Sequence, residues 1–265
     1  MRHLALLVAF ILCAAAPPPL RMSPTEEAAV KRVIERGERL FEVDRAAWIT
    51  TDDMIEKLGG DAGAPIKGWV VEPDATTVHA YVVTYFADGP SGPVAWYVGH
   101  MRNNKLVSGE LLPASSRPAL SAAQIRIARA VEAARAQSGY RPCTAARFNI
   151  DAIAPDAPDG PVDVYLLTAM VENGEYPFGG HFLLRVASDG KTVSSRKFTN
   201  TCLNIREPVG ANGEKPVALG VTHILDPVPT EIHVFLSIWT GKPIFVRTQK
   251  RAWLVDGPKI GLIGN

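Results

Sequence analysis

Two similar stretches, "TVHAYVVTYF" at residues 77–86 and "PVDVYLLTAM" at residues 161–170, decide the fold that we expect. The positions that correspond are Val78, Tyr81, Val83 and Thr84 in the first stretch and Val162, Tyr165, Leu167 and Thr168 in the second. Both stretches are rich in β-branched and aromatic residues and alternate imperfectly between apolar and polar side chains. This pattern is typical of strands that are buried on one face and partly covered on the other.

The similarity continues beyond these strands, since "NNKLVS" at 103–108 parallels "DGKTVS" at 189–194. It predicts an internal repeat of two four-stranded antiparallel meanders. The first comprises residues 67–72, 77–86, 93–100 and 105–112, and the second comprises residues 145–153, 162–171, 180–187 and 192–199. "EIHVFLSIW" at 231–239 is similar to the same strand, and with the following "IFVRT" it predicts a C-terminal β-hairpin.

A helix is expected before each meander. Ser23 and Glu26 form a capping box at the start of a helix over 24–42, and Ser121 and Gln124 form another at the start of a helix over 121–138. "TTDDMIEKLGG" at 50–60 predicts a short separate helix that stops at Gly59. A helix laid on an antiparallel sheet buries the apolar face of that sheet, so the fold class expected is α+β.

The chain begins with "MRHLALLVAFILCAAAPPPL", in which Arg2 precedes an apolar run. The run is shorter than the roughly 20 residues that cross a bilayer, and its layout is typical of a secretory signal peptide. We therefore expect a periplasmic or secreted protein. The expected organisation is a signal peptide at 1–16, a first helix and meander at 17–120, a second at 121–205, and a C-terminal loop and β-hairpin at 206–265.

Charge and composition narrow the possible partners. The chain has 28 basic and 27 acidic residues, and no long basic run, so a nucleic-acid surface is not indicated. No second long apolar stretch follows the N-terminus, so we expect no membrane span in the mature chain. Glycine-rich nucleotide-binding motifs do not occur in the sequence, and no cofactor is expected.

The cysteines predict one disulfide. If Cys13 leaves with the signal peptide, Cys143 and Cys202 remain, and in an oxidising compartment they most simply pair. The bond would close a loop in the chain, and the chain-entropy model predicts that this cross-link stabilises the fold by roughly 4 kcal/mol. The alternative is a catalytic thiol at Cys202, which no surrounding Cys-His signature supports.

One loop is the candidate binding site. "YPFGGH" at 176–181 places Tyr176, Phe178 and His181 around a proline and two glycines, which predicts a turn between strands. Exposed aromatic side chains beside strand edges are typical anchors for a partner. The alternative is that both rings fold back and cover the end of the sheet.

The sequence offers two candidate metal sites. "HILDPVPTEIH" brings His223, Asp226, Glu231 and His233 into one segment, and His181 could join them to hold zinc with Glu231 as a base. No H-E-x-x-H helix is present, and we expect the three histidines not to converge. The acidic stretch 151–163 could offer oxygen ligands to calcium, with Asp151, Asp156, Asp159 and Asp163, but it lacks the spacing of an EF-hand.

Four segments, "DRAAWITTDD", "YPFGGHFLLRV", "RKFTNTCLNI" and "HILDPVPTEIHVF", resemble a family of exported bacterial proteins of uncharacterised function. The helix-and-meander units look similar to those of PepSY-type exported domains at the level of fold only. The resemblance implies no catalytic residues. We therefore expect an exported, non-catalytic binding module for a protein or cell-envelope partner, and the alternative is a metal-dependent hydrolase using His181, His223 and His233.

Overall fold

The computed structural model describes residues 20–60, 65–157, 159–207 and 217–264, so the predicted signal peptide at 1–16 lies outside the described residues. The fold is α+β, as expected. Its helices are α1 (Pro24–Lys57), α2 (Ala122–Arg135) and α3 (Glu231–Thr240), with a short 3-10 turn at Ala114–Ser116. Within the described ranges, no helix has the length and hydropathy needed to cross a bilayer.

Two antiparallel sheets each follow the strand order of a meander. The first contains β1 (Gly68–Pro73), β2 (Ala80–Gly89), β3 (Gly92–Arg102) and β4 (Lys105–Leu111). The second contains β5 (Asn149–Ile153), β6 (Val162–Leu167), β8 (Phe182–Val186) and β9 (Thr192–Lys197). The eight strands expected in the two meanders are therefore confirmed. The equivalence of the two meanders as an internal repeat remains a prediction, which a superposition pairing Tyr81 on β2 with Tyr165 on β6 would test.

The C-terminal region is richer than the expected loop and hairpin. A four-stranded sheet contains β11 (Leu219–Thr222), β12 (Ile244–Arg247), β13 (Ala252–Asp256) and β14 (Lys259–Gly264), with β11 parallel to β12 and the other pairs antiparallel. A C-terminal strand hairpin is thus present, formed by β13 and β14. A small two-stranded sheet pairs β7 (Glu175–Pro177) with β10 (Asn204–Arg206).

The strand expected at 231–239 is wrong, because these residues form α3. Thr230 precedes the helix, and its backbone N–H donates to His233 Nδ1 at 2.9 Å. Gly241 ends the helix in the left-handed conformation, with φ +64°. Residues 231–237 are all buried, so apolar side chains occur on every side of the helix and the helical period disappears from the sequence.

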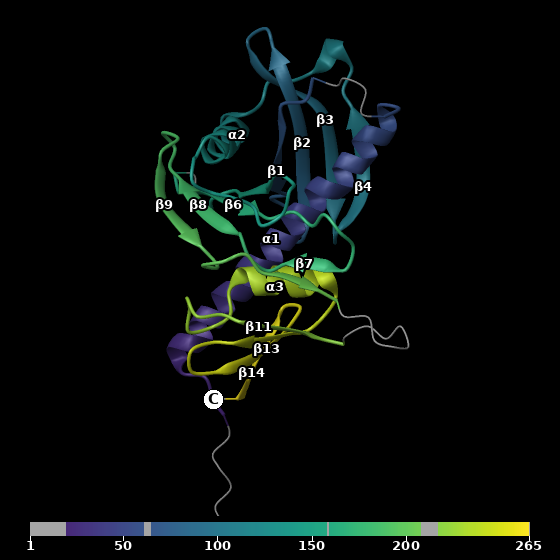
Figure 1. Ribbon diagram of the computed structural model, residues 1–265. Helices are drawn as coiled ribbons and strands as arrows, with labels where there is room; N and C mark the ends of the chain where they lie inside the picture. Colours follow the sequence, from purple (N-terminus) through teal and green to yellow (C-terminus); the bar gives the residue numbers. More distant parts are fainter. Residues whose placement is uncertain (1–19, 61–64, 158, 208–216, 265) are drawn as a thin grey trace, which may run out of the picture.

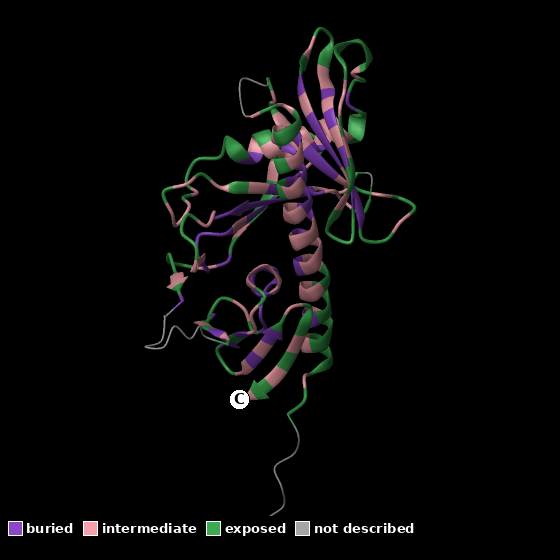
Figure 2. Ribbon diagram, turned by 90° about the vertical axis from the view of Figure 1, so that its right-hand side faces the viewer, coloured by how far each residue is buried: buried purple, intermediate pink, exposed green. Residues whose placement is uncertain are grey.

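The prediction of separate helices at 24–42 and 50–60 is also wrong. A single helix, α1, runs through both segments, because no proline or glycine interrupts residues 38–58 and Ala46 and Ala47 favour the helix. Its 34 residues make it about 50 Å long. Figures 1 and 2 show α1 running past both meanders to the C-terminal sheet, and it contacts strands of all three four-stranded sheets. Helix α1 therefore packs against several parts of the fold and does not belong to the first meander alone.

The second sheet is covered on both faces, which explains the weak alternation of β6. Val164 and Leu166 pack with α2, whereas Tyr165 and Leu167 face the core formed with α1 and α3. All six residues of β6 are buried. This strand therefore lies in the middle of the fold, between α2 and the α1–α3 pair.

An arginine links α1 to both the second sheet and α3. Arg36 Nη1 donates to Asp163 Oδ2 at 2.8 Å on β6, and its guanidinium lies 3.5 Å from Glu231 Oε1 at the start of α3. It also donates to the hydroxyl of Tyr165. These contacts satisfy two carboxylates that are almost completely buried, which a packed interior requires.

The expected disulfide is present. The Sγ atoms of Cys143 and Cys202 lie 2.09 Å apart, and their Cα atoms lie 5.3 Å apart. Cys202 is therefore not a free catalytic thiol. The bond joins the loop before β5 to the segment after β9, and both segments lie against the loop that carries β7.

Candidate functional site

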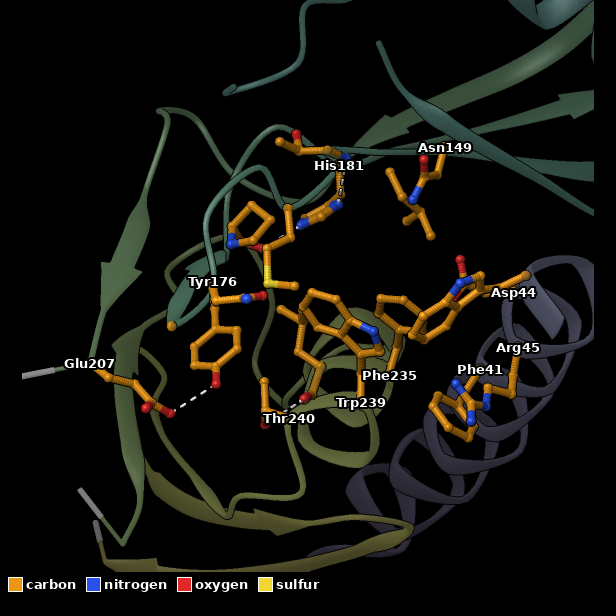
Figure 3. Close-up of a pocket in the computed structure, with 18 residues that line it drawn as sticks. Phe41, Asp44, Arg45, Asn149, Tyr176, His181, Glu207, Phe235, Trp239 and Thr240 are labelled. Carbon is orange, nitrogen blue, oxygen red and sulfur yellow. Dashed lines mark hydrogen bonds between the residues drawn. The ribbon is translucent and has the colours of Figure 1, made fainter. Parts of the chain in front are cut away.

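A cavity of about 940 Å³ lies between α1, α3 and the loop that carries β7 (Figure 3). Its aromatic lining consists of Phe41, Trp48, Tyr176, Phe235 and Trp239. Its polar lining consists of Asp44, Arg45, Asn149, Thr168, Asn173, His181, Glu207 and Thr240. The volume lies within the range of about 300–1,000 Å³ that is usual for sites of small organic ligands.

Helical spacing produces two of the cavity walls. On α1, Phe41 and Trp48 are seven residues apart with Asp44 between them, so all three project from one face. On α3, Phe235 and Trp239 are four residues apart, and their rings lie nearly parallel with centroids 6.3 Å apart. The cavity is therefore a gap between two helices whose facing residues are largely aromatic.

The loop "YPFGGH" supplies a third wall, but its two aromatic residues have different roles. Tyr176 lines the cavity, its ring meets Trp239 edge-on, and its hydroxyl donates to Glu207 Oε1 at 2.8 Å (Figure 3). Phe178 is only 3% exposed and packs in the core, so the hypothesis that it is an exposed anchor is wrong. Lys242 Nζ lies 3.1 Å from the same Glu207 oxygen.

The two glycines of this loop are required by the disulfide beside it. A Cβ atom on Gly179 would lie 2.6 Å from the backbone N of Leu203 and from the backbone O of Thr201. A Cβ atom on Gly180, whose φ is +74°, would lie 2.5 Å from Cys143 Sγ. The glycines therefore let the loop pack directly against the cross-linked segments.

His181 lines the cavity as a neutral imidazole. Its Nδ1 accepts from the backbone N–H of Thr168 at 3.2 Å. Its Nε2 lies 2.8 Å from the carbonyl oxygen of Pro177, which can only accept, so Nε2 carries the proton. Burial lowers the pKa of His181 to about 4. Both ring nitrogens are engaged, and the residue positions the loop.

The structure brings two of the three histidines of the zinc hypothesis together, since the rings of His223 and His233 meet edge-on with centroids 5.0 Å apart. His233 Nδ1 is taken up by Thr230 and His223 Nε2 by Asp226, at 2.9 Å and 2.7 Å. The carboxylate of Glu231 is directed to Arg36 and Arg196, and not to the histidines. Among the residues that the structure describes, no three His, Cys, Asp or Glu side chains are grouped so that they could hold a metal ion.

The acidic stretch 151–163 does not form a calcium loop. Asp151 is buried on β5, while Asp163 on β6 binds Arg36 and Arg185. Asp156 binds Arg39. The four carboxylates considered for calcium are thus spread over two strands and the loop between them, and arginines neutralise two of the four.

Beside the cavity lies a pair of carboxyl groups whose proximity sequence reasoning missed. Asp44 on α1 lines the cavity, its neighbour Asp151 lies on β5 outside the cavity lining, and each acid affects the pKa of the other. Asp151 is 2% exposed, and its Oδ2 finds no ordinary donor among the described residues. Two neighbouring carboxyl groups in a buried site do not both ionise readily, so the pair favours a state in which one of them carries a proton.

Burial is the main cause of the raised pKa of both acids. The pKa of Asp44 rises to about 6, and the negative charge of Asp44 raises the pKa of Asp151 further above its ordinary value. The pair therefore keeps a proton at a pH at which exposed aspartates have lost theirs.

Substitution of Asp151 by asparagine is expected to stabilise the protein at pH 8. Unfolded aspartates titrate near pH 3.9, and both folded-state pKa values are higher, so the folded state binds more protons above pH 4. The free energy of unfolding therefore falls as pH rises through about 6. Since one pKa unit corresponds to about 1.4 kcal/mol, Asp151→Asn should gain at least about 1 kcal/mol at pH 8 and much less at pH 4.

Urea unfolding of the wild type and of Asp151→Asn at both pH values measures this effect. Asp159→Asn, an exposed aspartate in the following loop, is the matched control and should change neither value by more than about 0.5 kcal/mol. An equal change at pH 4 and pH 8 for Asp151→Asn would show that the pair holds no extra proton.

Sequence reasoning located only part of this site. It identified Tyr176 and His181, which line the cavity, but not the aromatic residues of α1 and α3. The four-residue spacing of Phe235 and Trp239 was available as a signal, but the interpretation of 231–239 as a strand placed their side chains differently. Asp44 gave no signal, because its partner is more than a hundred residues away in the chain.

Comparison with known proteins finds no matching family model, no matching curated protein and no matching solved structure. The resemblance to exported bacterial proteins and to PepSY-type domains therefore stays a prediction.

Proposed function

We propose that this chain is an exported, non-catalytic binding module for a protein or cell-envelope partner, and that the cavity between α1, α3 and the β7 loop binds a group of that partner. The observation that carries the proposal is the cavity itself, with its volume of about 940 Å³ and its five aromatic residues. Binding sites of this size combine large apolar surfaces with a few polar groups that orient the ligand.

The aromatic lining is the main reason to assign binding to this cavity. Burial of aromatic surface dominates the energy of most binding sites, and tryptophan and tyrosine contribute most often. Trp239 lies between Tyr176 and Phe235 with ring-to-ring distances of 6.0 Å and 6.3 Å, so its position is fixed before a ligand arrives. Trp48 is half exposed beside this cluster, where an entering group meets it.

Two features support a periplasmic or secreted location. The N-terminal apolar segment has the layout of a signal peptide, and the Cys143–Cys202 disulfide suits an oxidising compartment. Among the described residues, the polar side chains that line the cavity do not form a nucleophile–base pair or a metal site of the kinds that hydrolases use, which favours binding over the hydrolase alternative.

Ligand-observed NMR with ring-bearing neutral, cationic and anionic probes tests the proposal. We expect at least one probe to bind the mature protein. Asn149→Trp, which places a large ring on the cavity wall from an exposed position, should reduce that binding at least about 10-fold. Trp239→Ala should do the same by removing the central ring.

Phe245→Ala is the control, because this half-exposed ring lies on the C-terminal sheet outside the cavity. It should leave probe binding unchanged. Probes that bind equally well to Asn149→Trp and to the wild type would place the ligand site elsewhere, and binding of no probe would contradict the proposal.

A further inference from the structure

We propose that the ligand of this cavity is an organic cation whose charged group lies beside Asp44 and whose apolar body lies between the aromatic rings of α1 and α3. This inference rests on the proposed function, since it assigns the chemical class of the ligand to the same cavity. It follows from the charges around the cavity, the burial of Asp151 and the arrangement of the rings.

Other carboxylates in this part of the fold already have cationic partners. Arg36 and Arg185 neutralise Asp163, and Arg36 also lies beside Glu231. On the far side of the cavity, Lys242 lies 3.1 Å from Glu207. The protein therefore balances these acids with its own arginine and lysine side chains.

The Asp44–Asp151 pair differs, because none of the ion pairs found among the described residues includes either acid. Arg45 acts on Asp44 only at a distance, and its guanidinium lies over the ring of Trp48 at 4.7 Å. Asp151 is 2% exposed, and its Oδ2 has no ordinary hydrogen-bond donor in the described part of the chain. A buried carboxylate that no positive charge balances is energetically costly, so a positively charged ligand beside this pair would stabilise it.

The rings around Asp44 favour a cation over other ligands. Phe41 and Trp48, three residues before and four residues after Asp44 on α1, both line the cavity. Phe235 and Trp239 line it from α3 (Figure 3). The faces of aromatic rings carry partial negative charge and attract organic cations, most strongly when water is excluded. Arg45 also lines the cavity, but its guanidinium lies over the ring of Trp48, so the cavity-lining acid that no ion pair among the described residues balances is Asp44. An anion would meet that acid, so its binding is disfavoured.

Binding of a cation should expel the proton that the two acids share. The charged groups that act on Asp44 are Arg45 on α1 and Asp151 on β5, and His181 in the facing loop is neutral. The pKa of Asp44 lies at about 6 without a ligand. A positive charge beside it lowers this pKa, so a proton is released near neutral pH.

Isothermal titration calorimetry with three probes of equal ring size tests the inference on the mature protein at pH 6.5. The probes are phenethylammonium, the neutral 2-phenylethanol and the anionic 3-phenylpropionate. We expect the cation to bind at least about 10-fold more tightly than the alcohol. Titrations in phosphate and in a zwitterionic sulfonate buffer, which differ in ionisation enthalpy and offer no organic cation of net positive charge, should show net proton release with the cation alone.

Asp44→Asn should weaken binding of phenethylammonium about 10-fold and leave 2-phenylethanol unchanged. Asp52→Asn, an exposed acid on the same helix, is the matched control and should alter neither. Equal affinity for cation and alcohol, or an unchanged cation affinity in Asp44→Asn, would overturn the cation class while the cavity remains a binding site. If none of the three probes binds, the cation class and the proposed function both fail.

Discussion

Replacement of Gly180 by alanine is expected to lower the free energy of unfolding by about 3 kcal/mol or more, which is a large part of the stability of an ordinary domain. The backbone at Gly180 has φ +74°, and an added Cβ would lie 2.5 Å from Cys143 Sγ and 2.6 Å from Thr168 Oγ1. Neither neighbour can move freely, because Cys143 is cross-linked to Cys202 and Thr168 donates to the carbonyl of Gly180. The loop that contains Gly180 would therefore have to move away from the disulfide.

Gly190→Ala is the matched control, since Gly190 has φ +82° but no atom lies within 4 Å of the position that its Cβ would take. Gly190→Ala should lower the free energy of unfolding only by the backbone strain, which is about 1 kcal/mol. Chemical denaturation of the two variants with the disulfide intact gives both values. Equal destabilisation would mean that the contact with the disulfide contributes nothing and that φ alone requires glycine.

Gly37→Ala is expected to destabilise the protein by about 2–3 kcal/mol, although alanine is the better helix former. In an open helix the change would stabilise by up to about 1 kcal/mol. Here an added Cβ would lie 2.5 Å from Val234 Cβ and 2.8 Å from the carbonyl oxygen of Glu231, where α1 crosses α3. The two helices would have to separate, which would also disturb the contacts of Arg36 with Glu231.

Thermal or urea unfolding of Gly37→Ala shows which effect is larger. The higher helix propensity of alanine would raise the free energy of unfolding, and the clash with α3 would lower it. Gly220→Ala, at an exposed strand position with no atom within 4 Å of the added Cβ, should change stability by no more than about 0.5 kcal/mol. A stabilised Gly37→Ala variant would contradict the close crossing of α1 and α3. Because these helices form two walls of the cavity, the destabilised variant should also bind the cationic probe more weakly.

The sequence by itself determined the features that depend on neighbouring residues. Ser23 with Glu26 and Ser121 with Gln124 form the expected capping boxes, since a cap involves residues only three positions apart. The strands of both meanders followed from alternation and turn residues in the same way. The Cys143–Cys202 bond followed by elimination, because only two cysteines remain after the predicted signal peptide.

Tertiary structure decided the features in which local signals were weak or ambiguous. Residues 231–239 carry β-branched and aromatic side chains that suit a strand, yet they form part of helix α3. This helix is buried on all sides, so its apolar residues show no helical period. Similarly, the loop sequence made Tyr176 and Phe178 equivalent, but Phe178 fills the core and only Tyr176 reaches the cavity. The environment of each ring is decided by the elements that pack against it, and these are distant in the sequence.

The cavity itself depended entirely on distant contacts. Asp44 and Asp151 are separated by more than a hundred residues, and α3 joins them from still further along the chain. Capping, periodicity and turn preferences act over a few residues, so they fix where elements begin and end. The burial of a carboxyl group and the partners it finds depend on which elements pack together, and the packing of α1 against β5 and α3 decides this.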